Sequence, residues 1–336
     1  MRVTIFSSKE YERSLLAKAA GEAGHRLTLQ PSRLNADTAV LSRGSKSVSA
    51  FVNDVLDAET LRVLAECGVG MVALRCAGFN NVDMAAASRL GIVVARVPAY
   101  SPHAVAEHTL TLALALSRKL CKAYNRVREG NFSLEGMLGT GLYGKTVGLI
   151  GTGKIGSATA GIFRGLGCKL IGFDVAPSAE CLAMGMTYST LPELMRNADI
   201  VSLHCPLTPE TRHLIGKAEI DQMKQGAMLL NTSRGAVLET RAVIAGLKSG
   251  KIGNLGLDVY EEEADVFFED LSGRGIQDDV LARLMTFPNV IVTGHQGFFT
   301  EEALSEIMRT TMENISEFER TGSCGNAVPP LKTIKP

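Results

Sequence analysis

A glycine-rich segment near the middle of the chain constrains the fold more than any other feature. In the stretch TVGLIGTGKIGSATAGIF, Gly151, Gly153 and Gly156 have the spacing G-x-G-x-x-G. The residues before them form an apolar run typical of a buried strand, and the residues after them repeat apolar side chains at helical spacing. A strand that turns this tightly into a helix belongs to an open parallel sheet, and the free N–H groups at the start of the helix can bind a phosphate. The segment therefore predicts an α/β domain with a phosphate-binding turn.

Short apolar runs alternate with longer amphipathic segments through most of the chain. The runs lie at 3–7, 49–53, 71–75, 92–97, 146–151, 169–174, 200–205, 227–233, 255–260 and 290–295. Strands that are apolar on both faces and separated by helices indicate parallel sheets covered on both sides. Ten strands are too many for one such sheet, so we expect an α/β protein with two doubly wound, Rossmann-like domains and a cleft between them.

Two helical segments are predicted to carry the chain between the domains. Residues 101–130 begin with Ser101 as a cap and Pro102 in the first turn, and we expect one long helix there. A second helix is expected near 300–320, with Thr300 as its cap.

These connections predict a discontinuous first domain. We expect residues 1–100 plus 299–336 to bind the substrate and residues 101–298 to form a Rossmann domain that binds the dinucleotide. About 140 residues precede the glycine turn, so the first domain must supply something other than that turn.

Composition excludes several classes of function. The 35 Lys and Arg residues balance the 35 Asp and Glu residues, which gives no electrostatic basis for binding nucleic acid or an anionic membrane. The seven cysteines are scattered and contain no CxxC pair, which argues against a metal site or a disulfide framework and for a reducing compartment. The apolar runs are too short for a signal peptide or a membrane-spanning helix. We therefore expect a cytoplasmic protein that binds no metal.

A carboxylate after the next strand indicates which dinucleotide binds. Asp174 ends the run KLIGFD, eighteen residues after Gly156. A carboxylate at this point can accept hydrogen bonds from both hydroxyls of the adenosine ribose, and it would repel a 2′-phosphate. Residues 175–178 contain no lysine or arginine. The sequence therefore predicts NAD rather than NADP.

Four further stretches, 203–211, 231–237, 257–263 and 293–299, follow strands of the second domain, at the edge where open α/β sheets bind ligands. Together they offer an arginine, carboxylates and a histidine. Arginine can grip a carboxylate through two parallel hydrogen bonds, and a protonated histidine can give its proton to a carbonyl oxygen. A carboxylate beside the histidine favours its charged form. This set suits hydride transfer to a 2-keto acid.

The chain resembles the D-isomer-specific 2-hydroxyacid dehydrogenase family over nearly its whole length. The glycine turn, NTSRG and DVYEEE are motifs of the whole family, whereas RCAGFNNVD, VPAYS, FFED and GHQGFFT are shared with a narrower group. The resemblance implies reversible reduction of pyruvate to D-lactate with NADH, and an assembly that is a homodimer or a homotetramer. The apolar helix expected at 101–120 suggests a dimer face.

The same resemblance implies roles for individual residues. Arg234 in NTSRG would bind the substrate carboxylate, His295 in TGHQ would be the acid–base group, and Glu263, five residues after Asp258, would be its partner. Further implied cofactor contacts are Gly151, Gly153, Lys154, Ile155, Gly156, Asp174, Cys205, Pro206, Thr232 and Asp258. Implied substrate contacts are Phe51, Cys76, Ala77, Gly78, Tyr100, Phe298 and Phe299, the aromatic residues shaping a small pocket.

The neighbouring acidic residues and the other histidines are expected to have ordinary roles. An extended chain would place Glu261 and Glu263 on one side, but Glu261 and Glu262 are expected to be solvated loop residues. His103 and His108 are expected to serve packing or an interface, His204 to be a core residue, and His25 and His213 to be exposed.

Two other functions stay open. Residue types do not fix the volume of a pocket, so a dehydrogenase for larger 2-keto acids, such as phenylpyruvate or 2-ketoisocaproate, is an alternative. A more remote one is an NAD-sensing corepressor, which would need a peptide-binding groove or long extensions that the sequence does not show.

Overall fold

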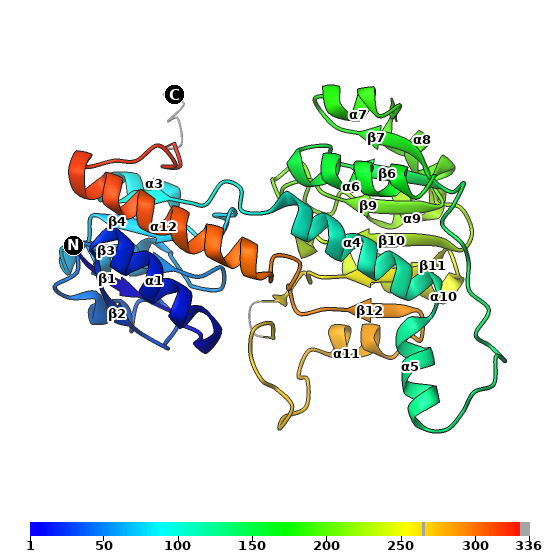
Figure 1. Cartoon of the computed structure of the whole chain (residues 1–336), viewed down its shortest axis with the longest axis horizontal. Coiled ribbons are helices and arrows are strands. Elements are labelled where there is room, and N and C mark those ends of the chain that lie inside the picture. The colour runs from blue at the N-terminus through cyan, green and yellow to red at the C-terminus, as the bar shows by residue number, and fades with distance from the viewer. Residues whose placement is uncertain (264–265, 330–336) are drawn as a thin grey trace. The chain divides into compact units, whose positions relative to one another are not determined.

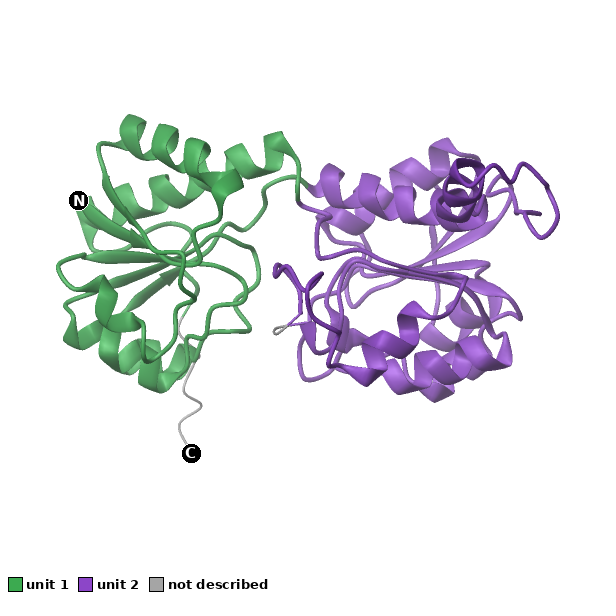
Figure 2. Ribbon diagram, turned by 90° about the horizontal axis from the view of Figure 1, so that it is seen from below, with its two compact units in different colours: residues 1–101, 299–336 green, residues 102–298 purple. Residues whose placement is uncertain are grey.

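The computed structural model describes residues 1–263 and 266–329 and divides into two compact units (Figures 1 and 2). Unit 1 comprises Met1–Ser101 and Phe299–Pro336, and unit 2 comprises Pro102–Phe298. The substrate-binding and dinucleotide-binding roles expected for 1–100 plus 299–336 and for 101–298 stay predictions. Each unit is a parallel sheet with helices on both faces (Figure 2), which confirms the expected fold class.

Unit 1 contains a five-stranded sheet in the order β2-β1-β3-β4-β5. Its strands are β1 (Arg2–Ile5), β2 (Arg26–Leu29), β3 (Ser47–Ala50), β4 (Met71–Leu74) and β5 (Val93–Ala95), and neighbouring strands pair in parallel. Its helices are α1 (Arg13–Ala23), α2 (Ala58–Glu66), α3 (Met84–Arg89) and α12 (Glu301–Thr321), with short 3-10 turns at η1 (Glu10–Glu12) and η2 (Ala39–Ser42). The predicted cap of α12 is confirmed, because the Thr300 side chain accepts a hydrogen bond from the N–H of Ala303.

Unit 2 contains a seven-stranded sheet in the order β12-β11-β10-β9-β6-β7-β8. Its strands are β6 (Thr146–Ile150), β7 (Lys169–Phe173), β8 (Thr187–Tyr188), β9 (Ile200–Leu203), β10 (Ala227–Asn231), β11 (Ile252–Leu257) and β12 (Val290–Val292). Its helices are α4 (Pro102–Ser117), α5 (Leu120–Arg128), α6 (Lys154–Gly165), α7 (Ala179–Ala183), α8 (Leu191–Asn197), α9 (Lys217–Gln222), α10 (Thr240–Ser249) and α11 (Asp279–Met285), and η3 (Gly235–Val237) is a 3-10 turn. The chain order reverses between β6 and β9, which is where open sheets of this kind bind ligands.

The prediction of a single helix at 101–130 is wrong. The segment forms two helices, α4 and α5, and Lys119 between them has a left-handed φ of 51°. The carbonyl of Ser117 at the end of α4 accepts a hydrogen bond from the N–H of Thr140, 2.9 Å away, instead of continuing the helix. The break follows from packing, because α4 buries apolar side chains in unit 2 whereas α5 buries none.

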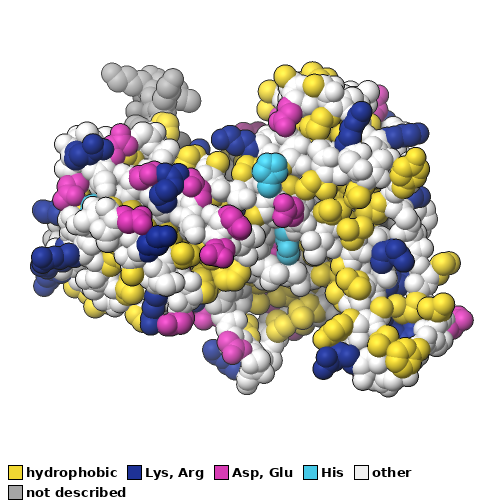
Figure 3. All heavy atoms as spheres, in the orientation of Figure 1, with side chains coloured by type: hydrophobic (Ala, Val, Ile, Leu, Met, Phe, Trp, Pro, Cys, Tyr) yellow, Lys and Arg dark blue, Asp and Glu magenta, His cyan; other side chains and the backbone are white. Residues whose placement is uncertain are grey.

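Most of the apolar side chains of α4 are buried within unit 2, whereas Leu114 is 40% exposed. A group of exposed large apolar residues lies in α5 and the segment after it, and part of this group is visible at the lower right of Figure 3. They are Leu120, Tyr124, Val127, Phe132, Leu134, Leu138 and Tyr143. Among the described residues, no helix is both long enough and apolar enough to cross a bilayer.

Candidate active site

Glycine is required at the three positions of the turn after β6 for different structural reasons. Gly151 has a φ of 91°, and a Cβ there would lie 2.6 Å from the backbone N of Cys205. A Cβ on Gly156 would lie 2.1 Å from the carbonyl oxygen of Gly151. A Cβ on Gly153 would meet no atom of the described residues within 4 Å. Gly153 therefore leaves open space in front of the first turn of α6, where unpaired N–H groups can bind a phosphate.

Asp174 lies beside this turn, directly after β7. Its Oδ2 accepts hydrogen bonds from the N–H of Thr152 at 2.5 Å and from the Thr152 hydroxyl at 3.1 Å, and its Oδ1 accepts one from the N–H of Ala176 at 3.1 Å. Burial works to raise the pKa of Asp174, but these hydrogen bonds outweigh burial and hold the pKa below its ordinary value. The carboxylate is therefore ionised at neutral pH.

Tyr188 on β8 belongs to the same network, and sequence reasoning missed it. Its hydroxyl donates to the Thr152 hydroxyl and accepts a hydrogen bond from the N–H of Ser178, both at 2.8 Å. Nothing in the spacing of the sequence marks this residue, because β8 is only two residues long.

The end of β9 closes the floor of the glycine turn. The N–H of His204 donates to the carbonyl of Ile150 at 2.7 Å, and its ring Nε2 lies 2.9 Å from the Ser202 hydroxyl. Burial lowers the pKa of His204 to about 4, so the ring is neutral, and its Nδ1 has no hydrogen-bond partner among the described residues. Burial also raises the pKa of Cys205 to about 11, so this residue is a thiol. Pro206 follows and is exposed.

The structure brings together the predicted histidine and its predicted carboxylate. Nδ1 of His295 lies 3.0 Å from Oε1 of Glu263, and both side chains are more than four-fifths buried. The other Glu263 oxygen accepts a hydrogen bond from the N–H of Tyr260 at 3.1 Å. Because Nδ1 faces the carboxylate, Nε2 on the far side of the ring is the atom that can face a substrate. The rings of Phe268 and Phe298 flank His295, with centroids 5.7 Å and 6.3 Å away.

The turn that carries Arg234 packs against the turn that carries Glu263. Arg234 follows β10, and its carbonyl accepts a hydrogen bond from the Asn231 side chain at 2.9 Å. A Cβ on Gly235 would lie 2.0 Å from the carbonyl carbon of Tyr260, so only glycine allows the two backbones to approach. The glycine of NTSRG thus sets the register of the arginine turn against the 260–263 segment.

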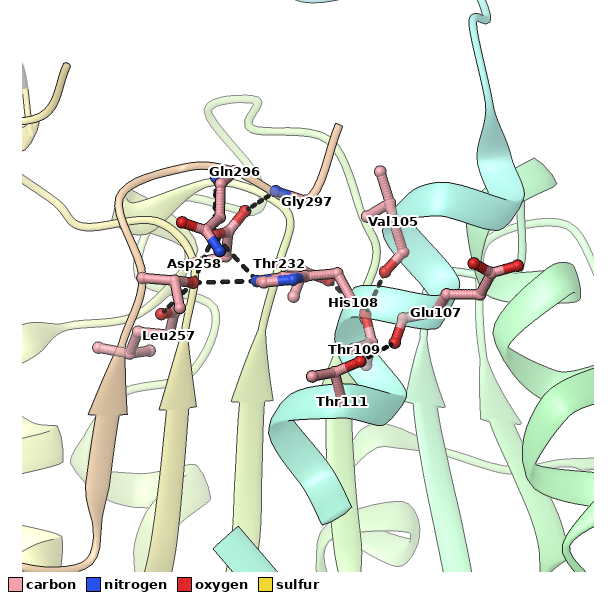
Figure 4. Close-up of polar contacts among 11 residues, drawn as sticks. Val105, Glu107, His108, Thr109, Thr111, Thr232, Leu257, Asp258, Gln296 and Gly297 are labelled. Carbon is pink, nitrogen blue, oxygen red and sulfur yellow. Dashed lines mark hydrogen bonds and ion pairs between the residues drawn. The ribbon is translucent and has the colours of Figure 1, made fainter. Parts of the chain in front are cut away.

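Asp258, at the end of β11, is 2% exposed and accepts hydrogen bonds from several groups (Figure 4). These come from the Thr293 hydroxyl at 2.5 Å, the N–H of Gln296 at 2.9 Å and the N–H of Gly297 at 2.7 Å. Nε2 of His108 lies 3.2 Å from the same carboxylate. Burial works to raise the pKa of Asp258, but the bonds from His108 and Thr293 outweigh burial and lower the pKa.

The expectation that Glu261 is a solvated loop residue is wrong. Its side chain is 16% exposed and pairs with Nε2 of His213 at 2.5 Å, while its other oxygen accepts bonds from the N–H and hydroxyl of Thr240 at 3.2 Å and 2.8 Å. Burial opposes ionisation, but these contacts outweigh it and lower the pKa of Glu261. The extended-chain argument fails because the chain turns after Tyr260, so that Glu261 faces α10 and Glu263 faces His295. Glu262 is exposed, as expected.

The expectations for the remaining histidines are partly confirmed and partly wrong. His103 is exposed, and so is His213 apart from its pairing with Glu261. His25, expected to be exposed, is 7% exposed, because its ring nitrogens bond to the amino group of Met1 and to the Ser316 hydroxyl in unit 1. His108, expected to serve packing or an interface, instead contacts Asp258 in the site.

The other predicted substrate residues lie at the carboxyl edge of the sheet of unit 1. Phe51 follows β3, and its N–H donates to Asp54 at 2.6 Å. Cys76, Ala77 and Gly78 follow β4, and the Cys76 thiol donates to the Gly78 carbonyl at 3.2 Å. Tyr100 follows β5 and is half-buried. The exposed ring of Phe299 forms a T-shaped contact with the ring of Tyr11, with the two ring centroids 4.7 Å apart.

Two residues that sequence reasoning missed lie directly beneath this edge. Arg75, immediately before Cys76, forms a buried ion pair with Glu12 at 3.2 Å, and its guanidinium lies over the Phe51 ring at 5.6 Å from the centroid. An apolar run that ends in arginine gives no sign that the arginine is buried. Within the described residues, no group of three or more His, Cys, Asp or Glu side chains could hold a metal ion.

A glycine turn at the switch point of a parallel sheet, with an ionised carboxylate after the next strand and a histidine–carboxylate pair at the same edge, defines the class of NAD-dependent dehydrogenases. Comparison with known proteins agrees. The family described as D-isomer specific 2-hydroxyacid dehydrogenase, NAD binding domain, matches residues 110–297.

Relatives match over nearly their whole lengths. The chain is 48% identical to D-lactate dehydrogenase of Escherichia coli, covering 97% of this chain and 99% of that one. It is 49% identical to 2-hydroxyacid dehydrogenase A of Aspergillus oryzae, covering 98% and 95%. The apo structure of the E. coli D-lactate dehydrogenase has a TM-score of 0.89 at 46% identity, covering 98% and 100%. The structure of D-lactate dehydrogenase with NAD⁺ from Lactobacillus jensenii has a TM-score of 0.81 at 32% identity, covering 98% and 99%.

The chain belongs to the D-isomer-specific 2-hydroxyacid dehydrogenase family. This confirms the resemblance found in the sequence. The protein is accordingly an oxidoreductase that binds NAD(H) and acts on a small-molecule substrate.

Proposed function

We propose that the protein is an NAD-dependent D-lactate dehydrogenase that reversibly reduces pyruvate to D-lactate. The observation that carries the proposal is the Glu263–His295 pair, 3.0 Å apart at the carboxyl edge of the NAD-binding sheet. The names of the relatives support pyruvate as the substrate, because two of them, 46% and 48% identical to this chain, are D-lactate dehydrogenases.

In this proposal the residues of unit 2 perform the chemistry. Arg234 holds the substrate carboxylate through two hydrogen bonds. His295 donates a proton from Nε2 to the C2 oxygen of pyruvate, and Glu263 orients the ring through its contact with Nδ1. Bound NADH would supply the hydride to C2. Pyruvate, NADH and one proton thus give D-lactate and NAD⁺, and in the reverse direction His295 accepts the proton.

The residues around the glycine turn fit NAD. We propose that the first turn of α6, with Lys154 and Ile155, holds the pyrophosphate, since the space in front of Gly153 is open. Asp174 would bind the adenosine ribose. The cofactor contacts proposed further along the sheet edge are Gly151, Gly156, Cys205, Pro206, Thr232 and Asp258.

Unit 1 is proposed to supply further substrate contacts. The N–H groups of Cys76, Ala77 and Gly78 would hold the substrate carboxylate together with Arg234. Four aromatic residues would restrict the space for the C3 group to about a methyl: Phe51, Tyr100, Phe298 and Phe299.

A dehydrogenase for larger 2-keto acids is the second candidate. It is favoured by the structural match to a D-2-hydroxyisocaproate dehydrogenase, which has a TM-score of 0.84 at 29% identity. The two candidates differ in substrate rather than in mechanism.

The test is a comparison of kcat/KM for pyruvate, glyoxylate, 2-ketobutyrate, 2-ketoisocaproate and phenylpyruvate with NADH, followed by chiral analysis of the product. We expect pyruvate to give the highest kcat/KM and the D enantiomer. A preference for phenylpyruvate or 2-ketoisocaproate would favour the second candidate. Binding of NADH without turnover of any of the five would contradict both and favour an NAD-sensing corepressor.

We also propose a homo-oligomer, either a homodimer or a homotetramer, located in the cytoplasm. The exposed apolar residues of α5 and the segment after it support self-association, because contiguous apolar patches on a surface mark interaction sites. The seven cysteines are free thiols, which supports a reducing compartment.

A further inference from the structure

A histidine on α4 completes the hydrogen bonding of a buried carboxylate beside the candidate active site. The His108 side chain is 14% exposed, and its Nε2 lies 3.2 Å from Oδ1 of Asp258 (Figure 4). The same nitrogen lies 3.0 Å from the Thr293 hydroxyl. The Thr293 hydroxyl donates its own hydrogen to Asp258, and a carboxylate can only accept. The hydrogen shared by the three groups must therefore be on His108 Nε2, so this residue is a donor to both neighbours.

Asp258 in turn holds the loop that carries His295. Its two oxygens accept the N–H groups of Gln296 and Gly297, which follow His295, and the hydroxyl of Thr293, which precedes it. His295 itself has a φ of 56°, a left-handed conformation that residues other than glycine rarely adopt. A backbone of this kind persists where its surroundings hold it on both sides, and here both sides bond to one carboxylate.

The helix that carries His108, α4, also forms a hydrogen bond with the turn after β10. The Thr109 hydroxyl lies 2.8 Å from the hydroxyl of Thr232, which follows β10 (Figure 4). Glu107, one residue before His108, points away from this network in the same view. Consecutive residues of α4 thus contact the turn after β10 and the loop after β12, which carries His295.

The same contacts lie close to both ends of unit 2 in the sequence. His108 is in the second turn of α4, which begins at Pro102, the first residue of unit 2. Gly297, bonded to Asp258, immediately precedes Phe298, the last residue of the unit. Asp258 therefore anchors the chain near its entry into unit 2 and near its exit.

We propose that His108 is a positioning residue for His295. By donating to Asp258 and Thr293, it keeps the 293–297 loop in the conformation that presents the His295 ring to Glu263. The proposal rests on the proposed function only where turnover is the readout.

The test compares variants at His108 with a matched control on the same helix. His108→Leu removes the donor, His108→Gln supplies an amide N–H in its place, and Glu107→Gln changes the exposed neighbour. We expect His108→Leu to lower kcat for pyruvate about 10-fold to 100-fold with KM changed much less, because small displacements of a reacting group cost this much. His108→Gln should stay within about fivefold of wild type, and Glu107→Gln should be unchanged. The first of these two variants keeps the hydrogen bond and the second does not touch it.

A second readout does not depend on turnover. The chain has six histidines, so in protein with labelled histidine the His295 ring resonances can be assigned with His295→Gln. They should shift in His108→Leu and in Glu263→Gln, and should stay in place in His108→Gln and Glu107→Gln. Should His108→Leu fail to fold, Thr293→Val, which removes the same hydroxyl link, is expected to behave alike, with Thr293→Ser as its control.

The outcomes separate this proposal from the proposed function. An inactive wild type with the expected resonance pattern would contradict the function and support the role of His108. An active wild type whose His108→Leu variant keeps its kcat, or whose loss is not recovered in His108→Gln, would overturn the role of His108 alone. Unmoved His295 resonances in a folded His108→Leu or Thr293→Val variant would do the same.

Discussion

Three of the four carboxylates in residues 258–263, directly after β11, are each held by different donors. Asp258 bonds to the loop that carries His295, Glu261 bonds to His213 and the start of α10, and Glu263 bonds to His295 itself. Each of these three carboxylates therefore fixes a different neighbour, although they lie close together in the sequence. Of these, only Glu263 contacts the proposed acid–base group.

His204 gives a prediction on the pH dependence of stability. Burial lowers its pKa from 6.5 to about 4 in the folded chain. Between these values the unfolded chain binds a proton that the folded chain does not, so the free energy of unfolding falls as the pH falls from about 6.5 towards 4. From pH 7 to pH 5 the expected contribution is about 2 kcal/mol, from 1.36 kcal/mol per pKa unit.

The measurement is urea unfolding of wild type and of His204→Gln, a side chain that cannot take up this proton, at pH 7 and at pH 5. Wild type should lose about 2 kcal/mol more than the variant between the two pH values. Equal losses would show that His204 does not stay neutral in the folded protein.

At this scale the sequence allowed only part of the site to be predicted. Glu263 and His295 were placed by family motifs, and the structure brings them together. His108 and Tyr188 were not found, because a side chain that bonds across 150 residues or across a two-residue strand leaves no periodic pattern. Glu261 was misjudged because its environment depends on a turn whose direction the residue types do not reveal.

Among the elements, the β6–α6 turn shows most clearly how one motif combines folding and binding. Gly151 and Gly156 are required by contacts within the chain, whereas Gly153 faces open space. The same residue type is thus needed for packing at two positions and for ligand approach at the third.

This difference predicts that alanine substitutions at Gly153 and Gly156 change different properties, NADH binding in one case and thermal stability in the other. Gly153→Ala should leave the melting temperature nearly unchanged and weaken NADH binding about tenfold or more, equivalent to about 1.4 kcal/mol, because its methyl group would occupy the space expected for the pyrophosphate. Gly156→Ala should lower the melting temperature, because its Cβ would lie 2.1 Å from the carbonyl oxygen of Gly151. Thermal unfolding and NADH fluorescence titration measure the two quantities.

Gly153→Ala with full NADH affinity would contradict the assignment of the phosphate site. Gly165→Ala in the last turn of α6 is a suitable control, because its Cβ also meets no atom of the described residues within 4 Å. It should leave NADH affinity unchanged, and it should not lower the melting temperature, because alanine favours a helix more than glycine does.

Strong apolar periodicity made most elements predictable. All ten expected strands are present, whereas β2 and β8 were missed because they are edge strands with few buried residues. The helix at 101–130 was expected to be continuous because no proline or glycine interrupts it, but the loop that returns to Ser117 ends α4 there. Tertiary contacts of this kind are not encoded locally.

For the whole molecule, the number of strands was enough to predict two doubly wound units. The chain leaves unit 1 after Ser101 and returns to it at Phe299, so all three predicted catalytic groups lie in unit 2. That arrangement places the arginine, the carboxylate and the histidine after β10, β11 and β12, three adjacent strands of one sheet. The family comparison confirms the class of enzyme that this arrangement defines.

The central claim is that His295, paired with Glu263, is the acid–base group of an NADH-dependent reduction of pyruvate. The most direct test is a single-turnover measurement of NADH oxidation by pyruvate in wild type and in His295→Gln, with the NADH dissociation constant measured for both. We expect the rate to fall by roughly 10² to 10⁴-fold, the usual contribution of general acid catalysis, with NADH binding little changed. A His295→Gln variant that reduces pyruvate at close to the wild-type rate would contradict the account.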